Sequence, residues 1–438
     1  MNESILGRFE GRASYDSIRR AVAVRPDEVS GLSGMDAGVA CEVLGNILGT
    51  IYLPTEFAIE FIGDMVRRAE QFYLDLFASE ERQMQRVYCP PVVGVFPVCL
   101  TGLAGVGKSQ MMGALLKVMP PPLEVISQHG VVQLCSYWYA SGAGKPGPRQ
   151  VLADFLQSKI ISSRGNVSRL IVECRRRVNR DGISLVVLDE TQHFNTGAGV
   201  THAVEVILNL SVLGAPTVFA TNYSLLHRLL NRNSEDQQRL LRDVRLMLPD
   251  SPRSRDWGEY VEEVVRVCAG VMKPTAFELS AELYRLTFGI KRLVVLLVKC
   301  AYLEARRRNN LSINMDDIQR AYQSMSYTSS RREVEHLHRA AIEGQSVLKN
   351  DLRCPFDLPG SYSSDISKFS RDDRDDRFWQ GVMRSALSKT ERQILGEIDS
   401  SSKLSKPTPK ASPKRSVQKP TIGELEEAHR SLVNALKR

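Results

Sequence analysis

The sequence contains no C-x-x-C pair and no apolar run long enough to cross a membrane, which needs about 18 or more residues. Its eight cysteines are scattered. They fit reduced thiols better than a zinc site, a redox motif or a disulfide scaffold, which need close or regular spacing. Residues 1–12 carry charges where a signal peptide would carry an apolar core. We therefore expect a soluble cytoplasmic protein that does not contact a membrane.

Aromatic residues are also few, and no repeat of fixed period is visible. Hydrophobic residues make up 43% of the 438 residues and charged residues 25%, which is a globular composition and excludes collagen-like and wholly disordered chains. The length allows about two to four domains. The formal net charge of +8 is compatible with a polyanionic partner.

The pattern along the chain predicts four segments. They are a helical N-terminal region at 1–90, an α/β core at 91–250, a helical lid at 251–330, and a C-terminal extension at 331–438. Helical spacing is clearest at 54–84, and a proline pair ends the first segment. The extension includes a lysine-rich stretch at 400–420, which we expect to be flexible, and an amphipathic helix at 422–436.

Short apolar runs alternate with helical patterns in the core. The expected strands are 92–100, 131–135, 184–188, 217–221 and 245–248. Continuous apolar strands separated by helices predict a parallel sheet covered on both faces. Strand signals then stop, and four helices are expected at 257–269, 276–287, 290–308 and 314–325. Asn314 is a typical cap for the last of them.

A glycine-rich run follows the first expected strand. Residues 102–109, Gly-Leu-Ala-Gly-Val-Gly-Lys-Ser, fit the phosphate-loop pattern G-x-x-x-x-G-K-[ST]. Such a loop wraps phosphates with backbone N–H groups, its lysine reaches the β- and γ-phosphates, and its hydroxyl binds Mg²⁺. We therefore predict ATP and Mg²⁺ as cofactors. The expected binding residues are Gly102, Gly105, Val106, Gly107, Lys108, Ser109 and Gln110.

Polar side chains stand at the ends of two later strands. Asp189 and Glu190 follow an apolar run, and the carboxyl edge of a parallel sheet is where such folds bind ligands. Asp189 is expected to join Ser109 in holding Mg²⁺, and Glu190 to orient the attacking water. Thr221 and Asn222 end the next strand, and Asn222 is the candidate contact for the γ-phosphate or the water.

Several arginines are candidates for sensing or stabilising phosphate charge. Arg292, beside Lys291 in a G-x-x-R run of the lid, can swing toward a nucleotide. Arg239 and Arg242 precede the last expected strand, and either is a candidate arginine finger supplied to a neighbouring subunit. For each, a solvated surface position is the alternative.

Contacts with DNA are harder to assign. Lys145, Arg149, Lys159 and Arg164 follow the second expected strand, near the aromatic run 137–139. Such cations grip phosphates without reading sequence, so we expect non-sequence-specific backbone contacts with double-stranded DNA. An ordinary exposed surface is an equally good interpretation.

Four passages carry a resemblance to a known family. They are LTGLAGVGKSQMM, ISLVVLDETQHF, LGAPTVFATN, and LTFGIKRLVVLLVKCAYLEARRR followed by LSINMDDIQRAY. These passages resemble TnsC/TniB-type AAA+ regulators of DNA transposition, and the D-E-x-Q-H string at 189–193 is especially similar to TnsC. The resemblance spans roughly residues 48–344.

This resemblance implies a P-loop AAA+ ATPase that assembles head to tail into rings or filaments on duplex DNA and links a target-selector protein to a transposase. It further implies that the N-terminal region faces the target selector and that the basic tail binds the transposase or DNA. The arginine finger cannot be matched residue by residue. Asn222 also stands where a small residue or proline is expected, which leaves the sensor open between Thr221 and Asn222.

Other functions remain open from the sequence. An initiator-like or loader-like AAA+ ATPase shares the lid motif and the basic balance. A nucleotide-gated signalling or defence NTPase would bind a protein and no DNA. A small-molecule phosphotransferase would need an acceptor pocket and a base, and neither is evident.

Overall fold

The computed structural model describes residues 3–127, 130–144, 147–156, 166–195 and 199–386. The chain forms two compact units, Met1–Arg374 and Asp375–Arg438. No helix in these described ranges combines the length and the apolar character needed to cross a bilayer. The expected tail at 400–420 and the helix at 422–436 lie outside the described residues.

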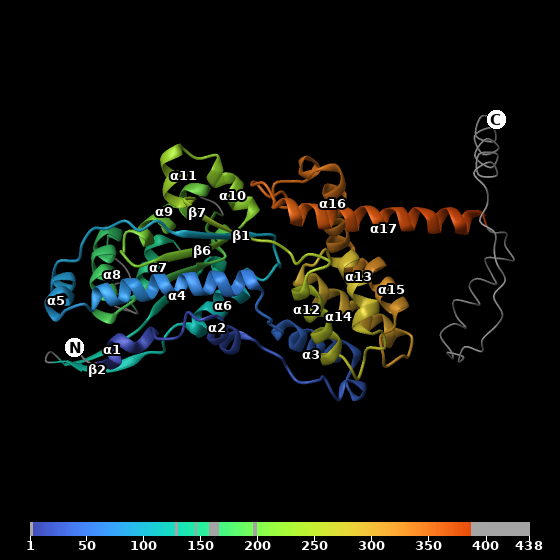
Figure 1. The fold of residues 1–438 in the computed structure, drawn as a ribbon, viewed down its shortest axis with the longest axis horizontal. Helices are drawn as coiled ribbons and strands as arrows, with labels where there is room; N and C mark the ends of the chain where they lie inside the picture. Colours follow the sequence, from blue (N-terminus) through green and yellow to red (C-terminus); the bar gives the residue numbers. More distant parts are fainter. Residues whose placement is uncertain (1–2, 128–129, 145–146, 157–165, 196–198, 387–438) are drawn as a thin grey trace, which may run out of the picture. The chain divides into compact units, whose positions relative to one another are not determined.

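A five-stranded parallel sheet forms the centre of the first unit, in the order β4-β5-β6-β1-β7 (Figure 1). The strands are β4 (Tyr137–Ser141), β5 (Leu185–Asp189), β6 (Thr217–Asn222), β1 (Val98–Gly102) and β7 (Asp243–Met247). Every residue of β1 and β5 is buried, as expected for inner strands of a sheet covered on both faces. Because Gly102 pairs with Asn222 and Ser141 with Asp189, the polar strand ends meet at one edge.

Two strand predictions were wrong. The run 131–135 forms part of β3 (Gly130–Leu134), which pairs antiparallel with β2 (Leu123–Ser127) in a separate hairpin. The strand of the main sheet is β4 instead, which contains the aromatic run 137–139. Trp138 is partly buried and stacks on Phe155 at 4.8 Å between ring centroids, while Tyr139 is exposed.

The first strand begins at Val98 and not at residue 92. Pro97 has no N–H to donate to a ladder, and the apolar residues before it stay exposed. The remaining expected strands agree with β5, β6 and β7 within a few residues.

Helices cover both faces of the sheet. One face carries α2 (Tyr15–Val22), α4 (Glu56–Leu76) and α6 (Lys108–Val118), whose apolar residues form one buried cluster with Leu100 and Val187. The other face carries α7 (Pro148–Phe155), α8 (Val167–Asp181), α9 (Val200–Ser211) and α10 (Tyr223–Leu230), which pack with Cys99 and Val186. Adjacent residues of one strand thus point to opposite cores. Figure 1 shows α4 running along its face.

The long helix expected at 54–84 is two helices. After α4 ends, Ser79 caps α5 (Glu80–Tyr88) by accepting the N–H of Arg82. The described chain also forms the short helices α1 (Glu3–Leu6) and α11 (Ser234–Leu240).

The helical lid consists of α12 (Arg255–Val267), α13 (Ala276–Thr287), α14 (Lys291–Arg307) and α15 (Met315–Gln323). The prediction that Asn314 caps the last helix is confirmed, since its side chain accepts the N–H of Asp317. The N-terminal helix α3 (Ala37–Thr50) packs against α14. Helix α16 (Thr328–Glu343) packs against α13, and α17 spans Gly360–Ala386. The fold of the described residues is therefore an α/β core around a parallel sheet, with a helical N-terminal region and a helical lid.

Candidate functional site

A cavity of about 670 Å³ opens at the carboxyl edge of the sheet. Its walls come from the loop after β1, the ends of β5 and β6, the first turns of α14, and the end of α3. Nine residues predicted from the sequence line it: Gly105, Gly107, Lys108, Ser109, Gln110, Asp189, Glu190, Asn222 and Arg292. Elements far apart in the chain therefore bring these side chains to one place.

Glycines give the loop its shape. Gly105 and Gly107 have φ values of 82° and 114°, a region that residues with a Cβ rarely adopt. A Cβ on Gly102 would lie 2.2 Å from the carbonyl oxygen of Met247, because β7 passes directly beside it. Val106 is buried in the core beneath the loop. Gly102 and Val106 thus hold the loop in place without lining the cavity.

Lys108 stands at the start of α6 and is only 8% exposed. Its Nζ donates hydrogen bonds to the carbonyl oxygens of Gly102 at 2.9 Å and Leu103 at 2.8 Å. The pKa of Lys108 is lowered to about 7, chiefly by burial and also by Arg292, against the opposing effects of Asp189 and Glu190. An anion in the cavity would supply the charge that this buried ammonium lacks.

The two carboxylates differ in their surroundings. Asp189 is buried at the end of β5, and its Oδ1 accepts the N–H of Glu190 at 2.7 Å. Glu190 has a φ of 50°, an uncommon value for a residue with a side chain and one that clusters at functional sites. A Cβ on Gly142 would lie 2.4 Å from the Glu190 carbonyl oxygen. The neighbouring turn therefore fixes the backbone of Glu190 closely.

The end of β6 separates the two sensor candidates. Asn222 lines the cavity, and its side chain does not cap α10. Thr221 is fully buried, and its hydroxyl donates to the carbonyl oxygen of Asn222 at 3.4 Å. Of the two, Asn222 is the one in position to meet a ligand.

The lid reaches the phosphate loop through its first helical turn. The backbone N–H of Arg292 donates to the carbonyl oxygen of Gly105 at 3.3 Å, and a Cβ on Gly105 would lie 2.7 Å from the Arg292 Nε. Lys291 also lines the cavity and pairs with Asp250 at 3.3 Å. Both cations of the G-x-x-R run thus lie on the side of the lid that lines the cavity.

The two finger candidates lie elsewhere. Arg239 pairs with Glu235 at 2.7 Å, and the guanidinium of Arg242 lies 4.4 Å from the ring centroid of Phe96. Both line a separate depression and not the cavity of their own chain. A finger supplied in trans requires this kind of surface position, so its assignment stays a prediction.

The DNA candidates are only partly described. Arg149 lies on α7, and β4 holds the aromatic run beside it. Lys145, Lys159 and Arg164 lie outside the described residues.

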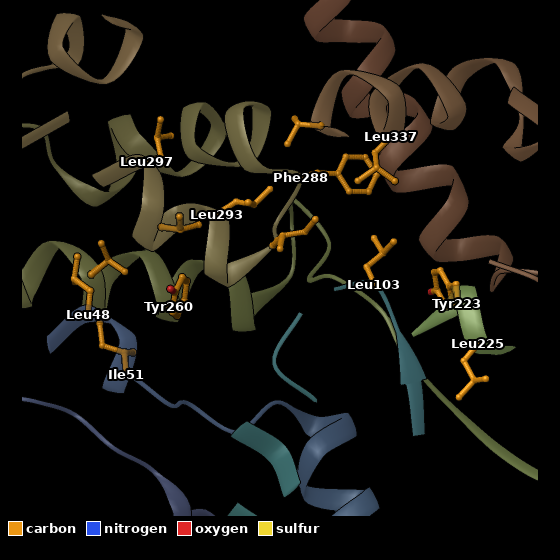
Figure 2. Close-up of a cluster of buried hydrophobic side chains, with 14 of the residues drawn as sticks. Leu48, Ile51, Leu103, Tyr223, Leu225, Tyr260, Phe288, Leu293, Leu297 and Leu337 are labelled. Atoms are coloured by element: carbon orange, nitrogen blue, oxygen red, sulfur yellow. The ribbon is translucent and has the colours of Figure 1, made fainter. Parts of the chain in front are cut away.

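One part of the site was missed in the sequence. Leu48 and Ile51 at the end of α3, Tyr260 of α12, and Val295 and Leu296 of α14 line the cavity away from the phosphate loop. Leu48 and Ile51 belong to the same buried cluster as lid residues such as Leu293 and Leu297 (Figure 2). This apolar wall suits a flat purine base.

The N-terminal segment is also fastened to the phosphate loop. The Gln110 side chain donates through Nε2 to the carbonyl oxygen of Gly49 at 3.0 Å. Nothing in the apolar spacing of residues 37–50 signals a ligand contact, because the same pattern serves an ordinary packed helix.

No family model matches the chain. No curated protein sequence matches it either. Among solved structures, the Aeropyrum pernix ORC1 protein in complex with DNA is similar at 15% identity, over 77% of this chain and 82% of that chain, with a TM-score of 0.38. Drosophila ORC bound to DNA is similar at 13% identity, over 87% of each chain, with a TM-score of 0.39.

The Thermotoga maritima RuvB Holliday junction branch migration motor is similar at 14% identity, over 65% of this chain and 77% of that chain, with a TM-score of 0.31. At these identities and scores, the likenesses carry no argument about activity or partners. The function has to be argued from this chain's own residues.

Proposed function

We propose that this chain binds ATP with Mg²⁺ in the cavity at the sheet edge and hydrolyses it. The observation that carries the proposal is the convergence of a glycine-shaped anion loop, a buried carboxylate, a strained glutamate and a lid arginine on one cavity. Each of these features costs stability, and together they suit a polyphosphate.

The residues present fit Mg²⁺ as well. The Ser109 hydroxyl and the Asp189 carboxylate both line the cavity, and oxygen ligands of this kind suit that cation. When bound, the ion neutralises charge on the transferring phosphoryl group.

The remaining side chains divide the work of hydrolysis. Lys108 holds the β- and γ-phosphates, and Asn222 and Arg292 contact the γ-phosphate from the sheet and from the lid. Glu190 orients a water in line with the bond to the leaving ADP. The water oxygen bonds to the γ-phosphorus, and the bond between the γ-phosphorus and the ADP oxygen breaks. The proton of the water leaves toward Glu190 or solvent. A neighbouring subunit supplies Arg239 or Arg242.

We further propose that ATP switches an oligomer, a ring or a filament, that assembles on double-stranded DNA and regulates transposition. This finer role rests on the four passages that resemble TnsC/TniB-type regulators. It assigns residues 1–90 to the target selector and 331–438 to the transposase.

Electron microscopy tests the assembly. The purified chain is imaged with random-sequence duplex DNA, with and without a non-hydrolysable ATP analogue. Nucleotide-dependent rings or filaments on DNA are expected, and Lys108→Ala, which removes the phosphate-loop charge, is the matched control that does not assemble. Particles that ignore DNA under all conditions would contradict the DNA role and favour a nucleotide-gated protein switch.

Solution measurements separate the remaining alternatives. Glu190→Gln is expected to bind ATP with wild-type affinity, to hydrolyse it poorly and to stay assembled; wild-type turnover would reject the role of Glu190. Assembly on DNA without any effect on a transposase would favour an initiator-like or loader-like ATPase.

A further inference from the structure

The turn that follows Glu190 presents a histidine to the same cavity. His193 belongs to the 3₁₀ turn η4 (Thr191–Asn195), and its Nε2 lies 3.9 Å from the Glu190 Oε2. Both side chains line the cavity, with 45% and 39% of their surface exposed. Among the described residues, His193 is the one basic side chain within 4.0 Å of this carboxylate.

The backbone of η4 is held firmly beneath these two side chains. The buried Thr191 hydroxyl donates to the carbonyl oxygen of Ala220 on β6 at 2.8 Å. Phe194 is buried in the core, and the His193 N–H donates to the Glu190 carbonyl oxygen at 3.0 Å. The Cα atoms of Glu190 and His193 are therefore fixed relative to each other.

We infer that His193 is a positioning residue for Glu190, and this inference rests on the proposed ATP hydrolysis. At 3.9 Å the two atoms are too far apart for a hydrogen bond, and the inference requires a change of the Glu190 rotamer that shortens this distance. The Nε2–H then donates to Oε2, which leaves Oε1 to hold the attacking water. No group transfer to His193 is involved.

A fixed partner matters because Glu190 is otherwise poorly constrained. Its carboxylate is more than one-third exposed, and free rotation would spread it over several rotamers. Lys108 also lies near enough to feel the charge of Glu190, but its Nζ is already engaged by two carbonyl oxygens of the loop. Orientation of a catalytic group within about 1 Å commonly changes rates by up to about a hundredfold.

The test compares His193→Ala and His193→Gln with the wild-type protein. Steady-state ATP hydrolysis gives kcat and KM, and a fluorescent ATP analogue gives the Kd. We expect His193→Ala to lower kcat about tenfold or more, with a Kd within about twofold of wild type. His193→Gln keeps a donor and is expected to recover much of kcat.

The matched control is His336→Ala, which removes an exposed histidine of α16 outside the cavity and should leave kcat unchanged. A double-mutant cycle adds a readout that a structural role would not give. If His193 acts through Glu190, then His193→Ala has no further effect in the Glu190→Gln background.

An unchanged or raised kcat in His193→Ala, or additive losses in the double variant, would overturn the inference while leaving the proposed ATPase intact. Absence of hydrolysis by the wild-type protein, with and without duplex DNA, would refute the proposed function and this inference with it.

Discussion

The depressed pKa of Lys108 predicts that nucleotide binding takes up a proton. Burial lowers this pKa to about 7 in the nucleotide-free protein. A bound polyphosphate supplies opposite charge to the ammonium and raises the pKa again. Between pH 7 and the pKa of the bound form, binding therefore takes up between about half a proton and one proton per nucleotide, and the apparent Kd increases with pH.

The magnitude follows from the titration curve. With a pKa of about 7, uptake is about half a proton per nucleotide at pH 7 and about nine-tenths at pH 8. Above that pH, the apparent Kd rises about tenfold per pH unit until the bound form titrates. The stability of the nucleotide-free protein changes with pH in the opposite direction to its nucleotide affinity. Its unfolding free energy rises with pH between about 7 and 10.5, because Lys108 still holds its proton in the unfolded chain there but has lost it in the folded protein.

Isothermal titration calorimetry measures the uptake directly. Binding of ADP and of a non-hydrolysable ATP analogue is recorded at pH 7.5, 8 and 9 in pairs of buffers with different ionisation enthalpies. The control is Lys108→Arg, whose guanidinium stays charged throughout this range. A wild-type Kd that is flat from pH 7.5 to 9, with no buffer dependence, would refute the reasoning about a buried, partly neutral lysine.

Three further variants test other parts of the site. Gly142→Ala pushes a Cβ against the Glu190 carbonyl oxygen and should lower both hydrolysis and the unfolding free energy, the latter by about 1–3 kcal/mol in a denaturant titration; Gly144→Ala, which meets no atom within 4 Å, should do neither. Leu296→Ala removes apolar contact from the base wall and should weaken nucleotide binding about fivefold, from roughly 1 kcal/mol of lost burial. An unchanged Kd would argue against a base at that wall. The double variant Arg239→Ala/Arg242→Ala should keep nucleotide binding but lower hydrolysis by the assembled protein about 10³-fold; equal losses in dilute, unassembled protein would contradict a finger supplied in trans.

Local sequence was sufficient to predict residues that the structure brings together at the loop side of the cavity. The loop needs glycines at fixed spacing, and the acids must follow a buried strand, so both leave a pattern within about ten residues of chain. The same locality explains why the helix predicted at 276–287 agrees with the bounds of α13. These features depend only on residues that are close together in the sequence, so a single sequence is enough to predict them.

The apolar wall of the cavity could not be predicted, because it depends on contacts between distant segments. Leu48 and Tyr260 come together only when α3 packs on the lid, and their spacing is that of ordinary core residues. The strand β4 was missed for a related reason, since its place in the sheet depends on pairing with the distant β5.

Part of the N-terminal region is attached to the lid and not to the sheet layer. Residues 25–51 leave the sheet layer formed by α2 and attach to the lid before α4 returns to the sheet. Arg25 pairs with Glu263 of α12, Val29 bonds to the Val267 carbonyl oxygen, and Lys299 of α14 pairs with Glu42 of α3. In this region the chain therefore passes between the sheet layer and the lid three times, before α3, between α3 and α4, and after β7.

Because α3 is bonded to α14 and the segment before it to α12, any displacement of α14 relative to the strands would move α3 with it. We expect a change in the cavity to reach residues 37–50 in this way, since Leu48 lines the cavity and Glu42 pairs with Lys299. A protein bound to α3 would then respond to the nucleotide state without touching the nucleotide.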